Sequence, residues 1–242
     1  MSTHADNEGR RLLSGEPLCE EGSYLQATLG GWFRLSESGA PVLLTVEHLL
    51  TPDPIRAASA CLAVGGPPPR LRWQGEDAIV NRRPEGRWLC HATSGERVAR
   101  VLASGVRPET GHQGPLDACI AAPVAPSLGS DEYPPLPWVP RVAEPREGST
   151  VLKFTRRGGL RHGRILCVSE SGDEVLVTST SEQPFAVEGD SGALLIDVEA
   201  RAAIGLHVGE VYMRYVKERQ WAVLWRARPL PLLMKAFHLR PY

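Results

Sequence analysis

The stretch AVEGDSGALLID, residues 186–197, places an acid, a hydroxyl and two glycines in one corner directly before an apolar strand. Two interpretations fit it. The corner is either an ordinary turn, or a loop that presents Ser191 as a nucleophile while backbone N–H groups face a developing negative charge. In the second case Gly189 and Ser191 are the expected donors, because glycine has no side chain to obstruct its N–H group. The rest of the chain decides between the two.

The composition is that of a globular protein built from strands. Of its 242 residues, 42 % are apolar and 23 % charged, and the formal net charge is −1. Such a balance offers no basic field to nucleic acid or to an anionic membrane, so neither is expected as a partner. No apolar run approaches the roughly 18 residues that span a bilayer. The 24 glycines and 21 prolines favour many short strands joined by turns.

The cysteines predict a reducing, cytoplasmic setting. Their number is odd, they form no CxxC pair, and they are scattered over the chain: Cys19, Cys61, Cys90, Cys119 and Cys167. The polar start of the chain does not resemble a secretory signal. No group of residues has metal-ligand spacing, and we expect neither a metal nor another cofactor.

Strand-like segments occur in both halves of the chain, on either side of a proline-rich stretch. Proline fixes φ and lacks an N–H group, so this stretch predicts an extended connector. The expected organisation is an all-β protein whose two halves form packed barrels, followed by a C-terminal α-helix. Its predicted parts are a polar tail (1–22), a first barrel (23–122), the connector (123–148), a second barrel (149–227) and the helix (228–242).

A base and an acid that could serve Ser191 stand at strand ends. His48 follows the apolar run 41–46, where it is either a satisfied core histidine or a base at the rim of a site. Asp117 enters the apolar segment 116–122, and burying such a carboxylate is costly unless it has a partner. Asp77 competes for the same role, but it lies among charged residues that look exposed.

Four motifs carry a family resemblance. The segments ATLGGWFR (27–34), LTVEH (44–48), LDACIA (116–121) and GDSGALLID with AIGLHVG (189–209) resemble the chymotrypsin/trypsin-like serine proteases, especially small intracellular bacterial members. The resemblance implies two antiparallel six-stranded barrels with the site between them. It implies that His48 is the general base, that Asp117 orients it, and that Ser191 is the nucleophile. The N–H groups of Gly189 and Ser191 would form the oxyanion hole.

The chain departs from this family's pattern in its cysteines and in its activation segment. Leu49 and Val187 stand where extracellular relatives have cysteines. In relatives activated by cleavage, the new N-terminal ammonium pairs with the Asp beside the nucleophile, and no IVGG-like segment precedes Tyr24. Asp190 must therefore find another partner or accept local backbone N–H groups, or else its loop becomes ordered only on binding.

The predicted specificity pocket consists of Phe185, Ala186 and His207. Phe185 occupies the position of the aspartate that attracts Arg and Lys side chains in trypsins. A trypsin-like preference for these two residues is therefore not expected. A histidine at position 207 resembles the glutamate-specific bacterial and glutamine-preferring viral relatives. Either Glu/Gln or a small apolar residue is expected before the scissile bond. The arginines of segment 155–164 are either a solvated turn or a surface that steers acidic substrate.

The sequence thus predicts an intracellular serine endopeptidase that makes limited cuts in a protein or peptide substrate, with activation of a downstream effector and a regulatory protein partner as further expectations. The alternative is a catalytically weak or inactive binding module on the same fold. An acyl hydrolase is disfavoured, because GDSGA precedes a strand and lacks the GxSxG pattern of that class.

Overall fold

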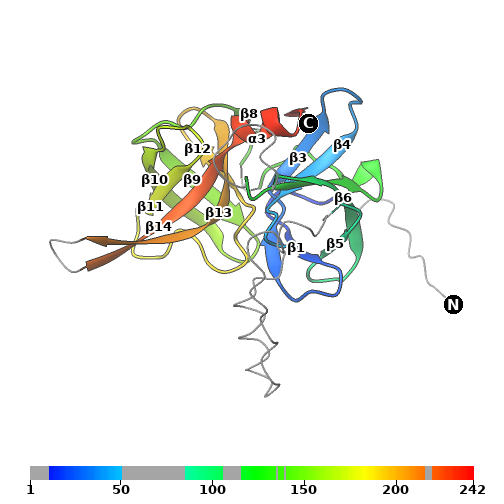
Figure 1. The fold of residues 1–242 in the computed structure, drawn as a ribbon, viewed down its shortest axis with the longest axis horizontal. Coiled ribbons are helices and arrows are strands. Elements are labelled where there is room, and N and C mark those ends of the chain that lie inside the picture. The colour runs from blue at the N-terminus through cyan, green and yellow to red at the C-terminus, as the bar shows by residue number, and fades with distance from the viewer. Residues whose placement is uncertain (1–10, 51–84, 106–115, 135, 139, 216–219) are drawn as a thin grey trace, which may run out of the picture.

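The computed structural model consists of two β-sheets packed side by side, each built mainly from one half of the chain (Figure 1). It describes residues 11–50, 85–105, 116–134, 136–138, 140–215 and 220–242, with backbone alone over 212–222. The competing acid Asp77 lies outside these residues. In the described part no helix is long and apolar enough to cross a membrane.

The first sheet has eight strands and curls into a half-barrel. Their order is β15-β3-β4-β7-β6-β5-β1-β2, and all pairings are antiparallel. The strands are β1 (Pro17–Glu20), β2 (Gln26–Thr28), β3 (Gly31–Leu35), β4 (Pro41–Thr45), β5 (Trp88–His91), β6 (Arg97–Ser104), β7 (Cys119–Pro123) and β15 (Leu239–Pro241).

The second sheet closes into a six-stranded barrel. The order β12-β9-β10-β11-β14-β13 is closed by pairing of β12 with β13, and β8 adds in parallel at the edge of β13. The strands are β8 (Arg141–Val142), β9 (Thr150–Thr155), β10 (Gly159–Val168), β11 (Val175–Ser179), β12 (Leu194–Asp197), β13 (Ala202–Tyr215) and β14 (Gln220–Pro229). The predicted all-β class is confirmed, with one closed barrel and one curled sheet.

The expected polar tail is wrong for residues 11–22. Leu12 is buried, and β1 pairs with both β2 and β5 while burying Leu18 completely. The short strand PLCE is difficult to recognise in the sequence, because charged residues surround it and only two of its residues are apolar and buried. The first sheet therefore begins before residue 23.

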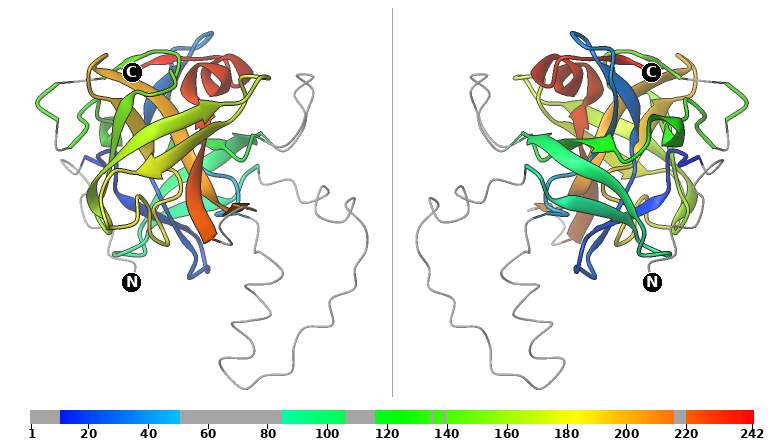
Figure 2. Two further views of the ribbon diagram at one scale, coloured as in Figure 1. Left: turned by 90° about the vertical axis from the view of Figure 1, so that its left-hand side faces the viewer. Right: turned by 90° about the vertical axis from the view of Figure 1, so that its right-hand side faces the viewer.

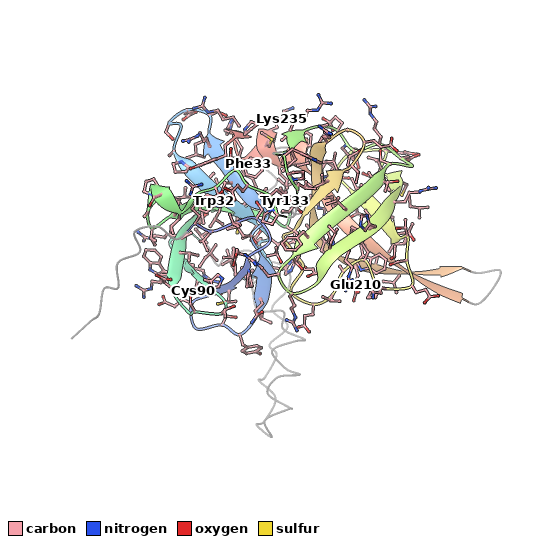
Figure 3. The ribbon with its side chains drawn as sticks, turned by 180° about the vertical axis from the view of Figure 1, so that it is seen from behind. Trp32, Phe33, Cys90, Tyr133, Glu210 and Lys235 are labelled. Atoms are coloured by element: carbon pink, nitrogen blue, oxygen red, sulfur yellow. The ribbon has the colours of Figure 1, made fainter. Side chains whose placement is uncertain are left out.

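The proline-rich connector contacts both sheets. A 3-10 turn, η1 (Pro126–Leu128), buries Leu128, and further along the Tyr133 hydroxyl donates to the Leu194 carbonyl at 3.1 Å. Figure 3 shows Trp32 and Tyr133 close together where the sheets meet, and both line one small cavity there.

The C-terminal helix is shorter than residues 228–242. Helix α3 (Leu230–Ala236) begins after Pro229, and its Leu230 and Leu233 are buried. The chain then continues as β15, which pairs with β3 of the first sheet. This crossing ties the end of the second unit to the first at one end of the molecule (Figures 1 and 2).

Candidate active site

His48 and Asp117 come together because their strands are neighbours. β4 and β7 pair with Thr45 opposite Cys119, so the residues just beyond these strand ends lie side by side. The His48 Nδ1 lies 2.9 Å from Asp117 Oδ2, and the His48 backbone N–H donates to Asp117 Oδ1 at 3.0 Å. Asp117 adopts a left-handed backbone with φ 48°, which aims its carboxylate back at the turn.

This contact determines which nitrogen of His48 carries the proton. A carboxylate only accepts hydrogen bonds, so Nδ1 must be the donor and Nε2 keeps its lone pair. The His48 side chain is 39 % exposed and that of Asp117 is 23 % exposed. The basic nitrogen can therefore meet a ligand while the orienting acid stays shielded.

The loop that carries Ser191 is held between the two sheets. Thr28, at the end of β2, donates from its N–H to the Ser191 carbonyl at 2.7 Å and from its hydroxyl to the Gly189 carbonyl at 2.8 Å. Thr45 in turn donates to the Thr28 carbonyl at 2.8 Å. Two hydrogen bonds thus connect the backbone at Ser191 to the strand that ends before His48.

Glycine is required directly after Ser191. Gly192 has φ +99°, and a Cβ there would lie 2.1 Å from the Thr28 carbonyl oxygen. Its N–H donates to the His207 carbonyl at 2.7 Å, on β13. A side chain at position 192 would therefore push the two sheets apart at the site.

The donors expected for an oxyanion are unengaged. Within the described residues, no carbonyl accepts from the N–H groups of Gly189 and Ser191, and both residues are partly exposed. In the same part of the chain, no hydrogen bond joins the Ser191 hydroxyl to His48. Such bonds are often long in unliganded enzymes and tighten when substrate binds.

Asp190 has a buried cation as its partner. Its side chain is fully buried and forms an ion pair with Lys153 of β9, which is also fully buried. Thr155 donates to the same carboxylate at 2.6 Å and the Val187 N–H at 3.0 Å. Of the alternatives left open by the sequence, a side-chain ammonium together with a local N–H is what the structure contains.

Lys153 was missed in the sequence, although it is an unusual residue. It interrupts the apolar run TVLKFT. The sequence does not show whether its side chain faces the core, and the strand buries it. Burial lowers the pKa of Lys153, and the Asp190 charge opposes that shift. Gly158 leaves room for the pair, because a Cβ there would lie 2.6 Å from Asp190 Oδ2.

The three predicted pocket residues do not share one surface. Phe185 is completely buried in the core of the second barrel, with His207 edge-on to its ring at a centroid distance of 6.5 Å. The His207 Nδ1 lies 3.2 Å from the Arg226 carbonyl oxygen, so it carries the proton. Burial lowers the pKa of His207 to about 3, which keeps the ring neutral. Ala186 lines a separate groove with Glu182, Trp225 and others.

The arginines around the β9–β10 turn have different surroundings. Arg156 pairs with Glu16 at 3.0 Å, and Arg161 hydrogen-bonds Gln183. Arg157 is exposed, and its Nη1 would lie 3.4 Å from a Cβ placed on Gly189. One positive charge therefore stands beside the candidate oxyanion loop. No group of acidic, His and Cys side chains suited to a metal occurs among the residues described.

Solved structures with the same fold are serine proteases. Thermobifida fusca Protease A is 14 % identical, covers 95 % of this chain and 97 % of its own, and has a TM-score of 0.56. A glutamic-acid-specific serine protease, described as using a novel histidine triad in substrate binding, is 15 % identical over 96 % of this chain and 100 % of its own, with a TM-score of 0.56. Cellulomonas bogoriensis chymotrypsin is 14 % identical over 96 % and 98 %, with a TM-score of 0.55.

These similarities establish a chymotrypsin-like fold. No family model matches the sequence. Neither does any curated protein.

Proposed function

We propose that this protein is a serine endopeptidase. The observation that carries the proposal is the pair formed by His48 and Asp117, whose oriented imidazole shares a hydrogen-bonded framework with Ser191. The neighbouring N–H groups of Gly189 and Ser191 have no carbonyl partner within the described residues and could receive an oxyanion, and the fold is that of known serine proteases.

In the proposed reaction His48 Nε2 takes the proton of the Ser191 hydroxyl as its oxygen attacks a peptide carbonyl. Asp117 keeps the proton of His48 on Nδ1 and stabilises the imidazolium that forms. The Gly189 and Ser191 N–H groups donate to the oxyanion of the tetrahedral intermediate. His48 then protonates the leaving amine, and water releases the acyl group by the same steps.

For the residue before the scissile bond, we propose glutamine or a small apolar side chain over glutamate. The resemblance implies that His207 borders this pocket, whereas in the structure its side chain is only 3 % exposed, so only a small part of the ring could meet a substrate. A neutral imidazole that donates from Nδ1 to Arg226 offers a lone pair at Nε2, which repels a carboxylate and accepts from an amide.

We further propose a cytoplasmic protein that makes limited cuts in a protein substrate and so activates an effector. Four of its cysteines, Cys19, Cys90, Cys119 and Cys167, carry free thiols, which suits a reducing compartment. A regulatory protein partner belongs to the same hypothesis, and gene neighbours are the first place to look for one.

The test combines a fluorophosphonate probe with a proteome-derived peptide library. The probe should label the wild type and not Ser191→Ala, and the substitution should lower kcat by roughly 10⁴–10⁶. Ser36→Ala, at an exposed serine on the β3–β4 turn, is the matched control and should label normally. Failure of both labelling and cleavage in the folded wild type would leave the inactive binding module as the better account.

A further inference from the structure

Glu47 is a buried carboxyl group next to the candidate base in the chain. It precedes His48 in the turn after β4, and it is 5 % exposed. The Ser104 hydroxyl at the end of β6 hydrogen-bonds its carboxyl, whereas Oε2 is buried and has no hydrogen-bond partner among the residues that the structure describes. A buried carboxylate with one unsatisfied oxygen is costly, so the site favours the protonated form.

The charges around Glu47 act in opposite directions. Asp117 repels its negative charge most strongly and Glu85 does so to a lesser degree, while His48 attracts it. The buried Cys119 thiol of β7 also lies within range of the Glu47 charge. Burial first and Asp117 second raise the pKa of Glu47 to about 7. The proton on Glu47 is therefore exchanged near neutral pH.

We propose that Glu47 is a positioning residue that couples its own proton to the charge state of the His48–Asp117 pair. An ionised Glu47 stabilises the His48 imidazolium, which cannot act as a base. Loss of a proton from either group makes the other hold its proton more tightly. The fraction of neutral His48 then rises with pH more gradually than it would for one isolated group. Its midpoint also lies at a higher pH than it would without the Glu47 charge.

This inference rests on the proposed function for its catalytic meaning, but its test does not need activity. The pH titration of the His48 Hε1 resonance is followed by NMR in Ser191→Ala protein, with and without Glu47→Gln. Glutamine mimics the protonated acid, so the midpoint should move to lower pH by about 0.3–1 unit, and the curve should steepen to one proton. Glu37→Gln, on the exposed turn before β4, should leave the curve unchanged.

A second measurement protects the test against a variant that does not fold. In Ser191→Ala protein labelled at glutamate Cδ, one carboxyl resonance should titrate near neutral pH and couple to His48. The proposal is overturned if every glutamate titrates below about pH 5, or if folded Glu47→Gln leaves the His48 midpoint and slope unchanged. Inactivity toward peptides would count against the proposed function and would not alter these titrations.

If the protein cleaves peptides, the rise of kcat/KM with pH on the acid side of its pH profile (the acid limb) should follow the His48 titration measured by NMR. In Glu47→Gln this limb should become steeper and shift to lower pH. A uniform loss at every pH would indicate a merely structural role.

Discussion

Replacing Lys153 with methionine tests whether a buried ion pair holds the oxyanion loop. Both side chains of the Lys153–Asp190 pair are fully buried, so the substitution leaves an uncompensated carboxylate inside the second barrel. Removing one partner of a buried pair costs about 3–5 kcal/mol. We expect the free energy of unfolding, measured by urea denaturation at pH 8, to fall by that amount.

The same substitution should disable the loop. Asp190 can escape burial only by moving, and it lies between the two expected donors, Gly189 and Ser191. Loss of one oxyanion donor costs about 10²–10³ in kcat, so fluorophosphonate labelling should slow by a similar factor. Lys153→Met with Asp190→Asn should regain most of the stability, because no charge is left buried. Lys235→Met, at the exposed end of α3, is the control.

One result would refute this reasoning. If Lys153→Met unfolds within about 1 kcal/mol of the wild type and reacts with the probe at the wild-type rate, the pair does not position the loop. If Lys153→Met is as stable as the wild type but reacts slowly with the probe, the ion pair positions the loop without contributing to the stability of the fold.

The remaining predictions concern the orienting acid, the buried histidine, the loop glycine and the thiols. Asp117→Asn keeps a residue that tolerates positive φ but offers the wrong tautomer to His48, so kcat should fall roughly 10⁴-fold with little change in melting temperature. The free energy of unfolding of the wild type should decline as pH falls from 6.5 towards 3, because His207 takes up a proton in the unfolded chain while its pKa in the folded protein is about 3. The slope should approach about 1.4 kcal/mol per pH unit. Urea denaturation at a series of pH values should show a flatter slope for His207→Leu. Gly158→Ala places a methyl group against Asp190, and slower probe labelling with a lower melting temperature would show it. Activity should be the same with and without a reducing agent, and a loss under reduction would contradict the free thiols of the four described cysteines.

Local pattern in the sequence was sufficient for the fold class, and together with the family resemblance it named the candidate residues. Short apolar runs between glycines and prolines predict strands wherever the chain folds, because alternation and turn chemistry are properties of a few adjacent residues. His48, Asp117 and Ser191 stood out for the same reason, since each is a polar residue at the end of an apolar segment. The structure adds the 2.9 Å contact between the first two, which follows from the register of β4 against β7.

Partners that lie far apart in the sequence were decided only by the tertiary structure. Lys153 and Asp190 are 37 residues apart, and no local signal relates them. The pairing of β15 with β3 joins the last strand of the chain to the first sheet, and β1 makes residues 17–20 part of that sheet instead of the expected tail. The state of His207 likewise depends on the Arg226 carbonyl of a neighbouring strand. A residue's own neighbourhood determines whether it forms strand or turn, whereas the partner of a buried charge is selected by strand register and by the cost of leaving that charge unpaired.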